Sequence, residues 1–385
     1  MKKRHITYLA CATTLAGAVL GTTPASAAHQ TLVVRPGESI QKAVNAARPG
    51  DTVLVMAGTY RENVTVKTPG LTLRGMGRAT VLRPPEKKKS TPAKKTTTAA
   101  HKKTTSTPHK KTTPAAHGKK APLTCRQAGN GICVIGGKNK ALPDVTIADL
   151  RVTGFPKTGV WSMGTDRLAV ERVTADDNGQ WGIADEHSTR AVFRGNTARG
   201  NGDAGLFLAN NVQAEEGATN SRGTLVAGNH VEGNRIGVTV RRLRNVSVLR
   251  NHVIGNCAGV FVVGDENKPK TSAVTIGYNL VERNNKYCPK TARLPYLKGS
   301  GIVLTGTEKA LVMMNAVTGH SGKSPLSGGI VLFKSFVGAT SVRNRITDNR
   351  LADNSPADLV NQESTKSANL FEGNACRASK PAGLC

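Results

Sequence analysis

Aromatic side chains are scarce in this 385-residue chain, where Phe, Trp and Tyr together make up 4% of the sequence. Glycine, by contrast, occurs 41 times. Such a composition argues against a large aromatic pocket, and against a helical bundle, because glycine inside a helix lowers its stability. It favours short strands and many tight turns around a narrow core of β-branched residues.

Long hydrophobic runs are absent after the N-terminus. The one apolar stretch, from Ile6 to Leu20, follows the charged residues 2–4 and precedes Ala25-Ser26-Ala27. A charged start, a short apolar run and small residues at a cleavage site are typical of a secretory signal. We therefore predict that residues 1–27 are removed after Ala27, that the mature protein is extracellular, and that no segment spans a membrane.

Acidic residues are outnumbered, with 25 Asp and Glu against 54 Lys and Arg and a net charge of +29. Residues 86–120 hold many of the lysines in a Lys, Thr, Pro and Ala pattern with almost nothing apolar to bury, which predicts a disordered insert. Coulomb attraction would draw such a chain to polyanions. We expect the partner to be an acidic polysaccharide or an anionic cell-wall polymer rather than nucleic acid, and a monomeric protein; the alternative is that the charge only keeps the protein soluble.

Six cysteines remain once Cys11 is assigned to the signal. An even number in an exported chain predicts disulfides, and local pairing gives Cys125–Cys133, Cys257–Cys288 and Cys376–Cys385. No C-x-x-C pair or matching histidine pair suggests a zinc site. No dense cluster of Asp residues is present, and Asp176-Asp177 and Asp265-Glu266 are only pairs, so no metal or other cofactor is predicted and calcium has no support.

Residues 28–85 are expected to form an N-terminal cap and the first coils of a solenoid. Apolar residues in Glu38–Ala47 recur at helical spacing, with Ser39 as N-cap and Pro49-Gly50 as the stop. Short β-branched runs follow at 52–56, 64–66, 71–73 and 80–82, separated by glycine and proline. A helix followed by very short strands is typical of a solenoid whose first coil is covered by a cap.

Residues 121–385 repeat a glycine followed by an aliphatic residue. These pairs begin at glycines 159, 182, 205, 237, 259, 301 and 329, and three of the six spacings are 22 or 23 residues. A period near 22 predicts stacked coils, because one coil cannot bury its own apolar face. The longer spacings are explained by inserts at 215–222, 268–272, 289–300 and 321–327.

Paired asparagines, such as Asn196 with Asn201 and Asn229 with Asn234, precede several of these glycines. Asparagine tolerates the left-handed backbone region and bonds locally, so it suits tight corners between strands. Stacked asparagines can also form ladders along the axis. Parallel crossovers are right-handed in nearly all proteins, which fixes the hand of the solenoid.

These features resemble the right-handed β-helix superfamily of pectate lyases, polygalacturonases and mannuronan epimerases. The entry segment Thr31–Tyr60 and the Asn-rich repeats carry the resemblance, which covers residues 31–84 and about 121–376. It implies an all-β, single-stranded right-handed parallel β-helix with a sugar-binding groove on an outer face. The basic insert and the Ala-Ser-Ala site resemble those of actinobacterial secreted proteins.

Counting from each glycine predicts which side chains face inward and outward. The first and third residues after the glycine should point into the core, and the second and fourth should point out. One outward column then contains Trp161, Phe207 and Phe261, whose rings could stack on sugars. The alternative is that loops cover this face and make it a second small core, since exposed apolar stripes are uncommon in monomers.

Polar residues interrupt these columns at Asp185, Glu186, His187 and Arg241, the candidate catalytic residues. A lyase or epimerase of acidic sugars must neutralise a carboxylate and move protons, which Arg and His can do. Residues 181–187 resemble the mannuronan epimerase pattern Tyr-Gly-Phe-Asp-Pro-His-Glu, with Asp and His displaced by one residue. Arg242 and Arg244, beside Arg241, are candidates for carboxylate or sulfate binding.

Two hypotheses follow for function. The first is a secreted β-helix protein that binds an acidic polysaccharide, with or without cleaving or epimerising it as a lyase or uronate epimerase does. The second is a non-catalytic structural or adhesion protein, a rigid rod held on the cell wall by its lysine-rich insert. Turnover of pectate, alginate or hyaluronan would favour the first, and salt-sensitive wall binding lost on deleting 86–120 the second.

Overall fold

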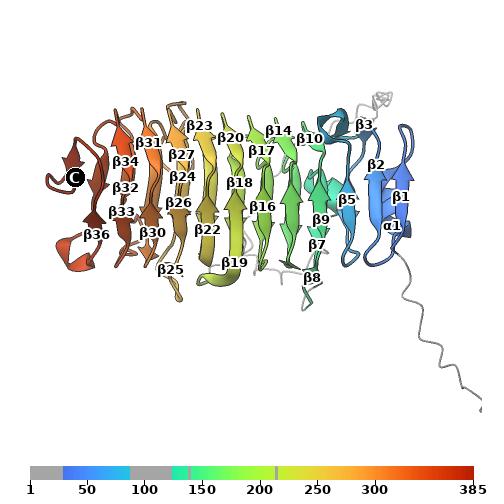
Figure 1. Cartoon of the computed structure of the whole chain (residues 1–385), viewed down its shortest axis with the longest axis horizontal. Coiled ribbons are helices and arrows are strands. Elements are labelled where there is room, and N and C mark those ends of the chain that lie inside the picture. The colour runs from blue at the N-terminus through green and yellow to red at the C-terminus, as the bar shows by residue number, and fades with distance from the viewer. Residues whose placement is uncertain (1–28, 87–123, 138–139, 213–215) are drawn as a thin grey trace, which may run out of the picture.

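The computed structural model describes residues 29–86, 124–137, 140–212 and 216–385. The predicted signal and the insert, apart from Glu86, lie outside these residues. The described chain forms a right-handed parallel β-helix, in which three long sheets run along one axis and successive coils stack side by side (Figure 1). This is the all-β architecture that the repeat predicted.

Each coil contributes one short strand to each of three sheets. Sheet A contains β1 (Thr31–Val34), β2 (Thr52–Val55), β5 (Thr72–Arg74), β9 (Thr146–Ala148), β13 (Ala169–Glu171), β16 (Val192–Arg194), β19 (Thr219–Ala227), β22 (Leu243–Leu249), β26 (Thr275–Gly277), β30 (Leu311–Met313), β33 (Arg345–Thr347) and β36 (Leu370–Glu372), with β25 (Thr271–Ser272) and β29 (Thr307–Glu308) beside them. Sheet B contains β3 (Gly58–Arg61), β6 (Thr80–Arg83), β10 (Arg151–Thr153), β14 (Thr174–Asp176), β17 (Thr197–Arg199), β20 (His230–Glu232), β23 (His252–Ile254), β27 (Leu280–Glu282), β31 (Ala316–Thr318) and β34 (Arg350–Ala352). Sheet C contains β4 (Val64–Val66), β7 (Ile132–Ile135), β11 (Val160–Met163), β15 (Ile183–Glu186), β18 (Ala204–Ala209), β21 (Ile236–Arg241), β24 (Ala258–Val263), β28 (Ser300–Thr305), β32 (Gly328–Leu332), β35 (Leu359–Asn361) and β37 (Ser379–Lys380); β8 (Leu142–Pro143) pairs with β12 (Thr165–Asp166).

Helices are few and short in the described residues: α1 (Ile40–Ala46), α2 (Cys125–Ala128) and the 3-10 turns η1 (Gly77–Ala79) and η2 (Thr365–Ser367). The predicted cap helix is confirmed as α1, with Ser39 as its N-cap and Ile40 and Val44 buried against the first coil. The Glu62 carboxylate accepts hydrogen bonds from the backbone N–H groups of Ile40 and Gln41, which fixes the first turn of the helix on the coil.

The core column is continuous from coil to coil on sheet C. The first residue after each repeat glycine is at most 1% exposed and pairs in register with its equivalent on the next strand: Val160, Ile183, Leu206, Val238, Val260, Ile302 and Ile330. The third residue after the glycine is also buried, as predicted. The inward and outward assignment made from the sequence is therefore confirmed on this sheet.

Asparagines form two ladders rather than one. Between sheets A and B the ladder contains Asn196, Asn229, Asn251, Asn279, Asn315, Asn349 and Asn374, each side chain donating to the next at 2.8–3.0 Å. Between sheets B and C it contains Asn178, Asn201, Asn234, Asn256 and Asn284. The left-handed corner position is taken by the residue before each Asn, such as Gly195 or Arg250, so that the Asn side chain points inward.

The three predicted disulfides are confirmed as Cys125–Cys133, Cys257–Cys288 and Cys376–Cys385. The first joins α2 to β7, and the second ties the long connection between β27 and β28 to the residue that precedes β24. The third ties the C-terminal residue back to the chain after β36. Each bond closes a loop of the solenoid and leaves the strand ladders unchanged.

His320 takes the place of an asparagine in the second ladder. Its Nε2 lies 3.0 Å from Asn284 Nδ2, and its Nδ1 lies 2.8 Å from Asn354 Oδ1. The neutral ring fits this place because Nε2 accepts and Nδ1 donates, as the two ends of an amide do. A proton on Nε2 would oppose the Asn284 amide donor. Burial lowers the pKa of His320 to about 4.

We predict that His320→Asn makes the protein less sensitive to mild acid. The folded-state pKa lies below the unfolded value of about 6.5, so this histidine stabilises the fold above pH 6.5 and that stability is lost toward pH 4. Urea unfolding at pH 7 and 4.5 measures the free energy of unfolding of both proteins. Between these two pH values the parent should lose on the order of 2 kcal/mol more stability than the variant. His187→Asn, at an exposed position, is the control; parallel pH profiles for His320→Asn and the parent would contradict the prediction.

Asp185 is a carboxylate inside the β-helix. It is 5% exposed and accepts a hydrogen bond from Ser162 Oγ at 2.6 Å. Removal from water raises its pKa to about 7, because the charged form is poorly solvated there. The folded state therefore holds this proton more tightly than the unfolded chain does.

We predict that Asp185→Asn stabilises the protein at pH 8. Since the folded pKa is raised, stability is fully present below pH 4 and falls as the pH rises toward 7, at a cost on the order of a few kcal/mol. Thermal unfolding at pH 4 and pH 8 measures the effect, and the gain should be confined to the higher pH. Asp353→Asn, an exposed position with the same charge change, serves as control; an Asp185→Asn variant that is less stable at pH 8 would refute this account.

Candidate functional site

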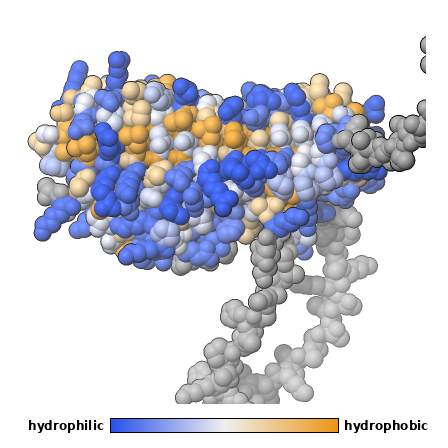
Figure 2. All heavy atoms as spheres, turned by 60° about the horizontal axis from the view of Figure 1, so that its bottom comes forward, coloured by the Kyte–Doolittle hydropathy of each residue, from blue (hydrophilic) through white to orange (hydrophobic). Residues whose placement is uncertain are grey.

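The outer faces of the three sheets differ in chemistry. Half-buried apolar side chains recur on the outer face of sheet A, although residues such as Ser247 and Gly277 lie between them in register: Leu225, Leu249, Leu311 and Met313. Figure 2 shows a band of apolar surface along the molecule, bordered by hydrophilic side chains. Sheet B presents charged residues on its outer face, and sheet C carries the residues singled out from the sequence. Polar and charged groups suited to binding a ligand are therefore found on sheets B and C.

The side chains of the predicted catalytic residues point in different directions. Three of the four residues lie at the end of β15, and Arg241 ends β21. Asp185 points into the core, whereas Glu186 points out of sheet C and is 7% exposed. His187 lies beyond the strand, exposed, with φ of 52°. Register places Glu186 beside Ala209 and Ala209 beside Arg241, so Glu186 and Arg241 are two rungs apart, as predicted. The four residues do not share one cleft.

The Glu186 carboxylate is held by its neighbours. Trp161 Nε1 donates to Oε1 at 2.9 Å, and the backbone N–H of Val212 donates to Oε2 at 3.2 Å. At the fourth and sixth positions of the epimerase pattern the outward residues are Ala184 and Glu186, where the pattern has Asp and His. The one-residue displacement thus leaves this face without the pattern's carboxylate and imidazole at those positions. A catalytic role for the four residues stays a prediction.

Loops cover most of the outward aromatic column. The Phe207 ring stacks on Trp181 with centroids 4.1 Å apart, and Phe207 is 7% exposed. Phe261 is 3% exposed in a second apolar cluster with Leu297 and Phe333. Trp161 is half-buried over Glu186. Of the two possibilities for this column, an open aromatic platform is not formed at Phe207 or Phe261, because connecting segments pack on both rings and make small apolar clusters.

A cavity of about 180 Å³ remains open on sheet C beside this cluster. Three residues singled out from the sequence line it together: Arg241, Arg242 and Phe261. Phe333, which the outward columns place next to Phe261, also lines it, whereas the sequence did not point to Arg293, Thr305 or Phe336. Arg293 and Phe336 lie in irregular connections with no repeat to mark them. Arg244, in β22, is not part of the lining.

The cavity combines cations with ring faces. Arg242 is 5% exposed and forms an ion pair with Asp265, whereas Arg293 and Phe336 are exposed. The Thr305 hydroxyl is buried and has no hydrogen-bond partner among the described residues. Guanidinium groups suit carboxylate or sulfate, and aromatic faces suit the flat side of a sugar ring. The arrangement is suited to binding, and the described lining contains no histidine for proton transfer.

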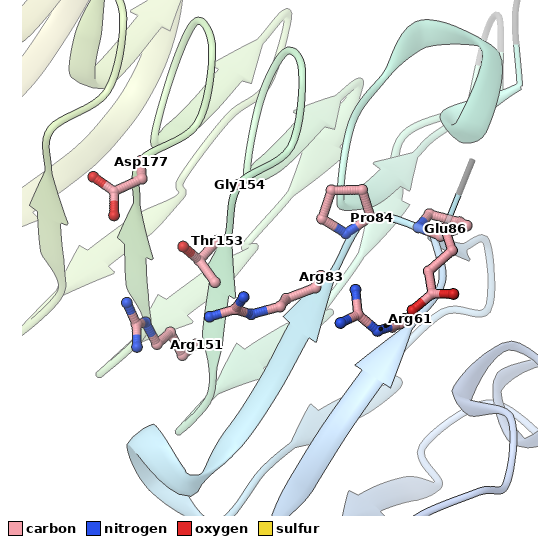
Figure 3. A pocket seen from close by; sticks show the side chains of 9 residues that line it. Arg61, Arg83, Pro84, Glu86, Arg151, Thr153, Gly154 and Asp177 are labelled. Atoms are coloured by element: carbon pink, nitrogen blue, oxygen red, sulfur yellow. Dashed lines mark ion pairs between the residues drawn. The ribbon is translucent and has the colours of Figure 1, made fainter. Parts of the chain in front are cut away.

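A second, larger hollow of about 490 Å³ lies on sheet B near the N-terminal end (Figure 3). Arg61, Arg83 and Arg151 line it from β3, β6 and β10, with Thr153 and Asp177 nearby. The sequence reading did not select these residues. Arg61 and Arg83 are 22 residues apart, one coil of the repeat, and that spacing was the signal that could have found them.

No group of three or more His, Cys, Asp and Glu side chains in the described chain is arranged to hold a metal ion. Nor does that part of the chain contain a helix with the length and apolar character needed to cross a membrane.

The chain resembles known proteins mainly in fold. A family model described as right handed beta helix region matches residues 123–276. None of the curated proteins compared with the chain matches it in sequence.

Solved structures of similar shape cover nearly the whole chain. The A-module of the Azotobacter vinelandii mannuronan C-5 epimerase AlgE4 has a TM-score of 0.54 and 17% identity, covering 87% of this chain and 90% of that one. The alginate lyase of Paenibacillus sp. str. FPU-7 has a TM-score of 0.54 and 13% identity, with 90% and 99% covered. Geobacillus virus E2 ORF18 has a TM-score of 0.52 and 14% identity, with 89% and 60% covered. At these identities the likeness is one of fold, and the protein is a right-handed parallel β-helix.

Proposed function

We propose that this protein is a secreted polysaccharide-binding β-helix that holds an anionic sugar residue in the cavity on sheet C. The observation that carries the proposal is the meeting of arginines with Phe333 and Phe336 around one small space. Two structures of similar fold belong to a mannuronan epimerase and an alginate lyase, which supports an acidic polysaccharide as the ligand class. Three disulfides support an oxidising, extracellular location.

The size of the cavity fits one sugar ring rather than a long chain segment. At about 180 Å³ it is smaller than pockets for drug-sized ligands, which start at about 300 Å³. Arg293 is positioned to neutralise a carboxylate, and Phe336 can cover a ring face. Arg242 is held in place by Asp265, so its guanidinium keeps a fixed orientation at the cavity wall.

We predict that Arg293→Gln and Phe336→Ala each weaken binding of short alginate or pectate oligosaccharides by about tenfold. Both side chains are exposed, so the variants should fold. Isothermal calorimetry measures the affinities. Lys290→Gln is the control for charge, since it lies in the same connection outside the cavity, and Tyr287→Ala is the control for an exposed ring.

The parent protein and its variants can also be assayed for lyase and epimerase activity. Ultraviolet absorbance detects the unsaturated uronates that a lyase releases, and proton NMR detects epimerised sugars. Turnover that is lost in Arg241→Ala or His187→Ala would add catalysis to the proposal. Binding that is equal in the parent, Arg293→Gln and Phe336→Ala would remove the cavity as the ligand site.

A further inference from the structure

The arginines on sheet B lie on consecutive rungs. Arg61 of β3 pairs in register with Arg83 of β6, so their Cα atoms lie on neighbouring strands about 4.8 Å apart. Arg151 lies on the next strand, β10, one column aside, because it pairs with Val81. Figure 3 shows Arg83 between Arg61 and Arg151 along the hollow.

Two of the three arginines have acidic partners. Arg151 donates to both oxygens of Asp176, with Nε at 2.9 Å and Nη2 at 2.5 Å, and the Asp176 side chain is fully buried. This bidentate pair fixes the guanidinium at the wall of the hollow. Arg61 lies 3.3 Å from Glu86, but the Glu86 side chain is 77% exposed, so the pair is weak.

Arg83 is exposed and forms no ion pair within the described part of the chain. Its nearest rung neighbour on one side, Arg61, carries the same charge. Like charges directly across neighbouring strands destabilise a sheet. An anionic group bound at Arg83 would relieve this repulsion, and the fixed Arg151 would add a second cation.

The walls of the hollow indicate which anion fits. About 490 Å³ is far more than one carboxylate fills, and Pro84, Pro85, Gly154 and the Thr153 hydroxyl provide room and contacts for the body of a sugar. The outward residues of the ten strands of sheet B include no Phe, Tyr or Trp on which a nucleic-acid base could stack. Glu232 and Glu282, farther along the same face, would also repel a continuous phosphate backbone.

We infer that this hollow is a second binding site, on a different sheet from the cavity of the proposed function, for a carboxylate or sulfate group of a linear glycan. Arg83 is its central ligand, and Arg61 and Arg151 flank the group. The site lies on β3, β6 and β10, whereas the cavity on sheet C is lined from β21 to β32 and the loops beside them. Because the two sites lie on different sheets, we expect the protein to bind two oligosaccharides, one at each site.

The test uses the full mature chain and two probes: a hexamer of galacturonate and a sulfated hexasaccharide from heparin. Calorimetry at about 0.15 M salt limits attraction by distant charges. We expect Arg83→Gln to weaken one site by about tenfold and Arg61→Gln/Arg83→Gln to abolish it, reducing the stoichiometry from two to one. If Arg83→Gln weakens binding of only one of the two probes, that probe identifies the anion as a carboxylate or a sulfate.

Arg350→Gln is the matched control, because Arg350 is exposed on the far strand β34 of the same sheet and the charge change is the same. An equal loss in Arg350→Gln would show general charge attraction and overturn the site. Unchanged binding in Arg83→Gln would also overturn the site. So would a short DNA duplex that binds the parent as tightly as the oligosaccharides do and loses as much affinity in Arg83→Gln. Arg293→Gln should leave binding at the Arg83 site unchanged and weaken binding at the cavity on sheet C, so the experiment tests the two sites separately.

Discussion

The hydrogen bonds of the asparagine ladders hold the coils in register, and the rest of the structure depends on them. Asn229 shows the pattern: its side-chain amide donates to Phe193 O and to Asn251 Oδ1, while its own backbone N–H donates to the same oxygen. One side chain thus satisfies backbone groups at a sharp corner that the strands leave unpaired. Buried polar groups without such partners would cost more free energy than the short strands recover.

Fixed corners make the outer columns continuous. From β9 onward each turn from sheet A to sheet B contains two residues, the first of them left-handed. The strands therefore have little freedom to slip, and residues one coil apart face the same way. This is why Glu186 and Arg241 stand on the same column with Ala209 between them. Length variation is confined to the other connections, and those connections decide which outer face stays open.

Features that depend on a local sequence pattern, such as the repeat strands and the cap helix, could be predicted from the sequence. Features that depend on the irregular connections between strands could not. The glycine-aliphatic repeat placed the inward columns, and Ser39 placed α1, because each depends on neighbours within a few residues or one coil. The strand β3 was missed, since Gly58 reads as a break although it begins the strand. The covering of Phe207 and Phe261 could be stated only as an alternative, because irregular segments without a period pack on them.

In the candidate site, too, the repeat places some residues correctly, whereas residues in irregular connections could not be predicted. The period of two correctly separated Asp185 from Glu186, and the structure shows how much this matters: one side chain is a buried acid in the core, and its neighbour is bound by Trp161 on the outer face. No such pattern marks Arg293 or Phe336, which reach the cavity from irregular connections. In a solenoid the coils therefore set where a ligand group can be placed, and the connections set whether a ligand can reach it. A protein of this kind can change its ligand through insertions at its loops while every rung of the ladder stays in place.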